Sequence, residues 1–297
     1  MSKIFVSGLM NVETSCRVDG FPIGYVPIQY NFFGVTSVAS GVGLNVTLAL
    51  TTLGDRVSIA SFAADDPAGD IVRSALTAVN DPRVAPCPQT PQSVVLFDGG
   101  GKRRVYTDLK DIQERELPGE FYSDLADFDA FCLCNVNFSR RLLPAAEATG
   151  MPIFCDVHCI SDICDEYNAD FMRAADVLFL SNESIRGREE SFIRSISSAY
   201  SCRVIVIGMG EVGAMLYTRE DDSVSVIPAV HTREVVNTVG AGDALFSAFT
   251  HFYVKGCPAR EALERASVFA SYKIGESGAT KGFLTEDEVL ELLSAQG

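Results

Sequence analysis

Short apolar runs alternate along this chain with longer stretches of helical periodicity, and no other feature limits the possible folds as strongly. The runs, which are typical of strands buried on both faces, lie at residues 4–7, 57–62, 130–134, 152–155, 177–180 and 203–207. Helices are expected at residues 42–53, 66–79, 139–149, 183–199, 241–255, 259–273 and 286–294. Strands that alternate with helices form a parallel sheet with helices on both faces. We therefore expect an α/β fold with three layers.

Two segments depart from this alternation. Residues 12–36 combine glycines, prolines and aromatic residues, which is typical of short antiparallel strands and turns. Residues 93–97 and 103–107 flank an Asp-Gly-Gly-Gly-Lys sequence, which predicts a hairpin because these residues tolerate positive φ. We expect insertions at about residues 12–36 and 88–108 to form a small antiparallel sheet, a lid or a dimer surface, on a single domain of residues 1–297.

Charge and cysteine content argue against several classes of protein. The chain has 24 Lys and Arg residues against 39 Asp and Glu, so its net charge of −15 would repel the phosphate backbone of nucleic acids. Its longest apolar runs are far shorter than the roughly 20 residues of a membrane-spanning helix. The N-terminus has no signal-peptide pattern, and the nine cysteines follow no disulfide pattern. We expect a cytoplasmic protein that binds neither nucleic acid nor membrane.

The strongest chemical signal is the sequence Asn-Thr-Val-Gly-Ala-Gly-Asp, from Asn237 to Asp243, at the start of an expected helix. First-turn N–H groups lack intrahelical partners and the helix dipole is positive there, so an anion can bind against the backbone. Asp243 lies in the same turn, where a carboxylate can accept the proton of an attacking hydroxyl as a phosphoryl group arrives. The alternative is a close-packed turn in which Asp243 only caps the helix.

A second glycine-containing sequence precedes the first expected helix. Gly41 and Gly43 allow a ligand to approach the main chain, and Asn45 offers a donor and an acceptor to hydroxyl groups. Asn11 and Glu13 follow the first strand at alternate positions, so both side chains can point to one side at the sheet edge where ligands bind. The alternatives are a tight turn with a capping asparagine and an ordinary solvated loop.

Three other patterns match known sites only in part. Residues 208–213 have the glycine spacing of a dinucleotide site, but a strand follows where a helix is needed, which argues against an NAD-dependent dehydrogenase. Residues 275–282 lack the Gly-Lys-Ser/Thr order of a P-loop. The spacing of Cys155, His158, Cys159 and Cys164 is not a familiar zinc pattern, and core thiols are the preferred interpretation.

The two glycine-containing motifs, Gly-Val-Gly-Leu-Asn and Asn-Thr-Val-Gly-Ala-Gly-Asp, together resemble those of the ribokinase family, the PfkB-type carbohydrate and nucleoside kinases. The resemblance covers essentially the whole chain. It implies a ribokinase-like three-layer α/β/α sandwich with a small β lid, ATP as the nucleotide, and Mg²⁺ bridging the phosphates. It also implies that Asp243 is the general base and that the backbone of Gly240, Ala241 and Gly242 forms the anion hole.

The same resemblance implies two sets of binding residues. Substrate hydroxyls are expected to bind at Asn11, Glu13, Gly41 and Asn45. The nucleotide is expected to bind at Asn182, Gly208, Gly210 and Gly213.

The chain also departs from the family's pattern. Asn237 replaces an Asp that helps bind a monovalent cation such as K⁺, so an oxygen ligand is kept there without its charge. The N-x-x-E sequence that orders magnesium is at best shifted, to residues 181–184, Gly208 replaces a Thr, and Glu13 replaces an Asp. Val42 replaces the Lys of ribokinases, which argues against free ribose as the substrate; the local sequence resembles that of pseudouridine kinases.

The function expected from the sequence is ATP-dependent transfer of the γ-phosphoryl group to a primary hydroxyl of a sugar or nucleoside, with Asp243 as general base. The alternative is a catalytically impaired kinase fold that serves as a sensor or assembly protein, because the departures at Asn237, Gly208 and residues 181–184 weaken the site. A homodimer through the lid is expected because the edge strands of the lid need covering.

Overall fold

The computed structural model describes residues 1–100 and 102–296 of the chain. Its largest element is a nine-stranded sheet in the order β13-β12-β11-β10-β9-β8-β1-β4-β5. The strands from β11 to β5 are parallel, and β12 and β13 extend one edge as an antiparallel hairpin. Their bounds are Lys3–Ser7 (β1), Arg56–Ala63 (β4), Asp81–Pro86 (β5), Ala130–Leu133 (β8), Ile153–Asp156 (β9), Val177–Ser181 (β10), Val204–Gly208 (β11), Gly213–Thr218 (β12) and Ser223–Pro228 (β13).

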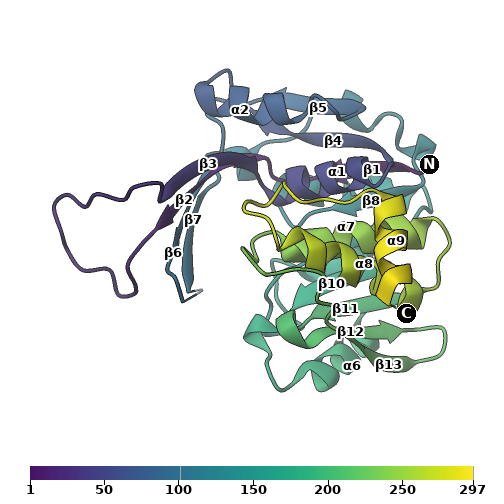
Figure 1. Ribbon diagram of the computed structural model, residues 1–297. Helices are drawn as coiled ribbons and strands as arrows, with labels where there is room; N and C mark the ends of the chain where they lie inside the picture. The colour runs from purple at the N-terminus through teal and green to yellow at the C-terminus, as the bar shows by residue number, and fades with distance from the viewer. Residues whose placement is uncertain (101, 297) are drawn as a thin grey trace.

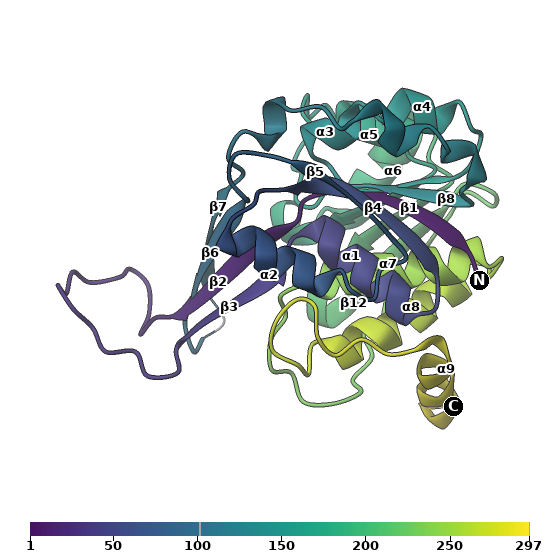
Figure 2. The ribbon, with the colours of Figure 1, turned by 90° about the horizontal axis from the view of Figure 1, so that it is seen from above.

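Helices cover both faces of this sheet, which confirms the expected three layers (Figure 2). One face carries Val42–Thr52 (α1), Pro67–Ala75 (α2), Ala241–Val254 (α7), Ala259–Lys273 (α8) and Glu286–Gln296 (α9). The other carries Asn137–Arg140 (α3), Leu143–Glu147 (α4), Ala169–Ala174 (α5) and Glu189–Ala199 (α6). Alternate residues of each strand enter opposite cores: Phe5 packs with the α3–α6 layer, whereas Ile4 and Val6 pack with α1, α7 and α8. In the described ranges, no helix is long and apolar enough to cross a membrane.

A smaller sheet, in the order β3-β2-β6-β7, projects from the body (Figure 1). Its strands are Asn11–Arg17 (β2), Val35–Ser40 (β3), Gln92–Phe97 (β6) and Arg103–Asp108 (β7). Its outer pairings are antiparallel as expected, but β2 and β6 pair parallel. The reason is that β2 follows β1 and β6 follows β5 along the chain. Because β1 and β5 run in the same direction in the main sheet, the chain leaves both of them at the same end of that sheet. Residues 18–34, expected to add short strands, form instead a long loop that extends far from the body.

Three local expectations differ from the structure. The helix expected at residues 139–149 is two short helices, α3 and α4, with Pro144 in the first turn of the second. The helix expected at residues 183–199 starts only at Glu189, because Gly187, at φ 79°, interrupts it. The strand β5 was not expected, since it contains Pro82 and Pro86; proline is tolerated there because β5 is an edge strand.

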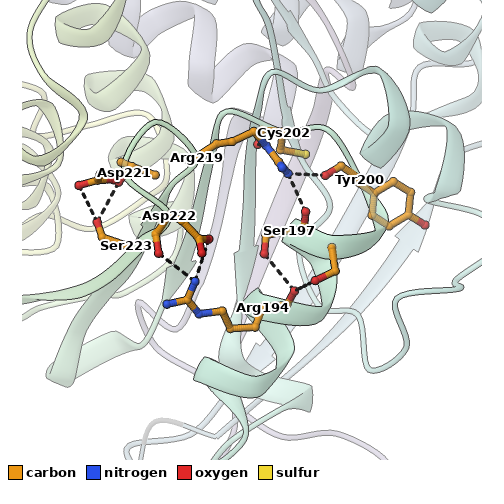
Figure 3. A network of polar contacts seen from close by, with 10 residues as sticks. Arg194, Ser197, Tyr200, Cys202, Arg219, Asp221, Asp222 and Ser223 are labelled. Carbon is orange, nitrogen blue, oxygen red and sulfur yellow. Dashed lines mark hydrogen bonds and ion pairs between the residues drawn. The ribbon is translucent and has the colours of Figure 1, made fainter.

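Two arginines hold the β12–β13 hairpin against α6 (Figure 3). Arg219 donates to the carbonyl oxygens of Ser197 and Tyr200 at 2.7 and 2.6 Å, near the end of α6. Arg194, on α6, donates to the carboxylate of Asp222 in the hairpin turn at 2.9 Å. Because the last carbonyls of a helix lack intrahelical partners, Arg219 both caps α6 and anchors the hairpin. These contacts fix the turn between β12 and β13, whereas Gly213, at the opposite end of β12, borders the site described next.

Candidate active site

A cavity of about 650 Å³ opens where the parallel strands end. Asp156, Ser181 and Gly208 are the last residues of β9, β10 and β11, and all three line it. Parallel strands present their carboxyl ends at one sheet edge, which is where ligands bind in open α/β folds. The start of α7, the hairpin residue Gly213 and one face of α8 complete the walls, and Arg103 reaches the cavity from β7 of the small sheet.

The start of α7 presents bare backbone to this cavity. Gly240 adopts φ 76°, and a Cβ there would lie 3.1 Å from Ala279, so the turn requires glycine. A Cβ on Gly242 would meet nothing within 4 Å, so the space in front of it is open. The Ala241 N–H already donates to the Thr238 carbonyl at 3.2 Å, which leaves the N–H groups of Gly242 and Asp243 as first-turn donors for an anion.

Asp243 lies in the cavity wall, and its carboxylate accepts a hydrogen bond from Asn45 Nδ2 at 2.6 Å. Burial raises the pKa of the Asp243 carboxyl above its usual range, while the hydrogen bond from Asn45 and the nearby His158 act in the opposite direction. A partly buried carboxylate beside first-turn N–H groups is suited to accept a proton close to a bound anion.

The substrate residues expected from the sequence lie on the side of Asp243 that faces the small sheet. Asn11 Nδ2 donates to Ser93 Oγ at 2.6 Å, and Ser40 Oγ donates to Glu13 Oε2 at 3.4 Å, so Asn11 and Glu13 share one face of β2 as expected. Burial raises the pKa of Glu13. These residues do not line the 650 Å³ cavity; Asn45 links them to it through Asp243.

Two features of this group bear on ligand binding. The side-chain carbonyl oxygens of Asn11 and Asn45 are buried and, within the described ranges, accept no hydrogen bond from the protein. Unpaired buried acceptors are costly, so they are available for ligand hydroxyl donors. The backbone at Gly41 requires a glycine, because φ is 105° there and a Cβ would lie 2.5 Å from the Leu9 carbonyl oxygen.

The residues expected to hold the nucleotide divide into two groups. Gly208, Gly210 and Gly213 line the cavity, in a strand–turn–strand rather than the strand–turn–helix of a dinucleotide site. Asn182 is not among the lining residues, because its side-chain amide turns to Glu189 and donates to that carboxylate at 2.8 Å.

Several cavity residues were not identified from the sequence as site residues. Asp156 and His158 face each other at 3.6 Å, and Cys159 Sγ donates to Glu183 at 3.3 Å. Asp156 ends an apolar run, the kind of position where a ligand-facing residue is expected in a parallel sheet. Cys159 and Cys164 are exposed, so the interpretation as core thiols is wrong for them and correct for Cys155. Across the described residues, no three His, Cys, Asp or Glu side chains cluster as metal ligands.

Comparison with known proteins decides the family. The pfkB family carbohydrate kinase model matches residues 1–286. The chain belongs to the pfkB family. As a member of this kinase family, it is a phosphotransferase with an alcohol group as acceptor.

Similar pfkB proteins agree with the architecture. The chain is 24% identical over 276 residues to an acarbose 7(IV)-phosphotransferase of Actinoplanes sp., covering 91% of each chain. Among solved structures, it matches the microbiome-derived acarbose kinase Mak1 with a TM-score of 0.88 and 23% identity over 99% of each chain. It matches Arabidopsis thaliana ribokinase, solved with ribose and ATP, with a TM-score of 0.83 and 17% identity over 98% of each chain. These structures support a ribokinase-like fold with a large sheet between helices and a smaller sheet beside it.

Proposed function

We propose that this pfkB protein is an ATP-dependent kinase that transfers the γ-phosphoryl group to a primary hydroxyl of a sugar or nucleoside. The observation that carries the proposal is the placement of the Asp243 carboxylate in the first turn of α7, next to the open backbone of Gly242 and 2.6 Å from Asn45. A base on one side and bare N–H donors on the other are what an attacking hydroxyl and an arriving phosphoryl group require.

In this mechanism, Asp243 accepts the proton of the attacking hydroxyl. Its raised pKa strengthens it as a base, and the Asn45 hydrogen bond holds the acceptor oxygen in place. The first-turn N–H groups of Gly242 and Asp243 bind the transferring phosphoryl group, with the positive end of the α7 dipole behind them. Arg103, on the cavity wall, adds a positive charge from the small sheet.

Magnesium would neutralise charge on the nucleotide phosphates. Mg²⁺ keeps several waters and takes one or two carboxylates plus substrate phosphates, so it does not need a preformed cluster of protein ligands. Asp156 and Glu183 are carboxylates on the cavity wall that fit this description. Gly208, Gly210 and Gly213 border the space in which we place the nucleotide.

The substrate class follows from the chemistry beside Asp243. The unpaired oxygens of Asn11 and Asn45 and the carboxylate of Glu13 are acceptors for hydroxyl groups, which suits a polyol such as a sugar or the ribose of a nucleoside. Val42 has no charge to offer, which argues against free ribose, and a pseudouridine-like nucleoside remains one candidate. Similarity to an acarbose phosphotransferase adds acarbose to the candidates.

We further propose that residues 1–297 act as one kinase domain, with the small sheet as a lid that excludes water from the reaction. The lid face opposite Asn11 and Glu13 exposes Val94 and Tyr106, which are paired in register. An exposed apolar sheet face with open edges favours a homodimer through the lid. Light scattering tests this by measuring the mass of the particle in solution. The wild type should have the mass of a dimer and Val94→Glu that of a monomer. A wild type with the mass of a monomer would exclude the dimer.

The proposed reaction is tested by ADP release with Mg-ATP. The acceptor panel contains acarbose, ribose, fructose, adenosine, guanosine, cytidine and pseudouridine, and Asp243→Asn is the matched control. We expect one acceptor to raise ADP release well above the ATP-only rate, and the variant to lose that increase while it still binds ATP in calorimetry. An acceptor-dependent rate that survives in Asp243→Asn would contradict the assignment of the base.

The alternative is a kinase fold that binds ligands without turnover. Asn237, Gly208 and the turned-away Asn182 favour it, whereas Asp243 at a bare helix start favours catalysis. If calorimetry detects binding of ATP and of an acceptor, but no ADP is released, the chain binds ligands without turnover.

A further inference from the structure

A buried lysine lies directly behind the start of α7. Lys273, in the last turn of α8, has a relative exposure of 0%, and its ammonium donates a hydrogen bond to the carbonyl oxygen of Val239. That oxygen belongs to the same peptide group as the N–H of Gly240, the residue that precedes α7 and lines the cavity. Lysine is almost never fully buried without a specific partner, so this placement needs an explanation.

Electrostatics keep this ammonium available as a positive charge. Within the described part of the chain, no carboxylate lies within ion-pair distance of Lys273; Asp243 and Glu13 act on it from further away. Burial lowers the pKa of Lys273 to about 8, and the two carboxylates oppose this shift, so the side chain is mostly protonated at neutral pH.

The departure at Asn237 puts binding of a monovalent cation in doubt, and the residues present do not fit such an ion. Asn237 offers no charge, and its Oδ1 accepts the Val239 N–H at 2.8 Å. The carbonyl oxygens of Thr238 and Ile274 accept backbone N–H groups, and that of Val239 accepts the Lys273 ammonium. A K⁺ ion at this loop would share the Val239 carbonyl oxygen with the Lys273 ammonium. Two positive charges so close together in a poorly solvated space repel each other strongly.

We propose that the Lys273 ammonium takes the place of an activating monovalent cation, so that this kinase works without K⁺. The inference rests on the proposed function, because it assigns a positioning role behind the same anion hole. An ammonium that hydrogen-bonds the Val239 carbonyl polarises the Val239–Gly240 peptide group and holds it in one orientation, which fixes the turn that leads into the N–H donors of Gly242 and Asp243. It also supplies a fixed positive charge close to the transferring phosphoryl group.

The first test uses the wild type and needs no variant. ADP release with the best acceptor is measured in KCl, NaCl and choline chloride at a constant ionic strength of about 0.1 M. We expect the rates to agree within about twofold. Stimulation by K⁺ of about tenfold or more over choline would overturn the inference while leaving the proposed function intact. If no acceptor supports turnover in any salt, the proposed function fails first.

The second test removes the ammonium and offers K⁺ in its place. Lys273→Ala should lower turnover in choline chloride by about 10²-fold. Replacing choline chloride with KCl should raise the turnover of this variant by at least about tenfold, whereas LiCl should not raise it. The exposed Lys281→Met is the matched control and should keep the wild-type salt response. A folded Lys273→Ala protein that is fully active, or inactive in every salt, would overturn the inference.

A readout independent of turnover completes the test. Thermal unfolding is followed in KCl and choline chloride at equal ionic strength, where a specifically bound ion raises Tm by mass action. We expect a Tm increase specific to K⁺ in Lys273→Ala and none in the wild type. A K⁺-specific increase in the wild type would show a cation site that the lysine does not fill, and would overturn the inference even if Lys273→Ala does not fold.

Discussion

Asn45 and Asp243, 198 positions apart in the sequence, are joined by a hydrogen bond of 2.6 Å between the Asn45 amide nitrogen and the Asp243 carboxylate. Asn45 lies in the first turns of α1 and Asp243 in the first turn of α7, and the two helices pack on the same face of the sheet. The contact therefore joins the two glycine-containing motifs at one point. It brings the side expected to bind the substrate to the side expected to bind the phosphoryl group.

Loss of this contact should change the pH dependence of catalysis. The Asn45 amide lowers the pKa of Asp243 by bonding its charged form, so Asn45→Ala should raise that pKa further. We expect the acid limb of the kcat/KM profile to move to higher pH, and kcat/KM at neutral pH to fall by about 10-fold or more. The control is Asn80→Ala, since Asn80 Oδ1 accepts the Val57 N–H at the opposite end of the sheet. An unmoved acid limb in Asn45→Ala would assign that limb to another group.

Replacement of Asp243, the proposed base, should separate activity from stability. In Asp243→Asn we expect turnover to fall by about 10²- to 10⁴-fold. Because the folded-state pKa of Asp243 is raised, its charged form destabilises the folded protein at pH values above that pKa, and the cost disappears as the pH falls through it. The variant should therefore have the higher Tm at pH 7, with the difference shrinking toward pH 4. Calorimetric scans check this, and a variant with a lower Tm at pH 7 would contradict the raised pKa.

Two glycines of α7 should respond oppositely to alanine. Gly242→Ala places a methyl group in open space, so the free energy of unfolding should rise by about 0.5–1 kcal/mol. Turnover should fall, because the methyl would occupy the proposed phosphate position. Gly240→Ala should destabilise the protein, because its φ of 76° is strained for alanine and Ala279 lies 3.1 Å away. Urea unfolding and ADP release measure both effects. A Gly242→Ala protein with normal turnover would place the phosphate elsewhere.

A buried pair at the other end of α7 should matter for stability and not for chemistry. His251 Nδ1 lies 2.7 Å from the Asp55 carboxylate, and both side chains are almost fully buried. Asp55→Ala leaves the histidine without this partner and should lower the free energy of unfolding by about 3–5 kcal/mol. The exposed Lys255→Ala, which breaks the ion pair with Glu286, should cost at most about 1 kcal/mol. A change in kcat greater than about twofold in folded Asp55→Ala would show coupling to the site.

Much of the architecture could be predicted because its signals are local. The apolar runs that became β1, β4, β8, β9, β10 and β11 were visible as such, and so were α1, α7 and α8. Elements with weaker local signals cannot be predicted in this way. The strand β5 contains two prolines that are tolerated only because it lies at the sheet edge, and edge position is a property of the assembled sheet. The parallel β2–β6 pairing depends in the same way on where β1 and β5 leave the main sheet.

The site shows the same division. Asp243 and the glycines before it could be recognised from their spacing, because a bare helix start is encoded within a few consecutive residues. The placement of Asp156, His158 and Glu183 on the cavity wall, and the turning of Asn182 toward Glu189, depend on how separate strand ends pack together. Lys273 gave no signal at all, since a lysine at the end of a helix is ordinarily exposed. Local sequence therefore determines the bare helix start and the place of Asp243 in it. The contact of Asp243 with Asn45 and that of Lys273 with Val239 arise from long-range packing, because only the folded chain brings α1, α7 and α8 together.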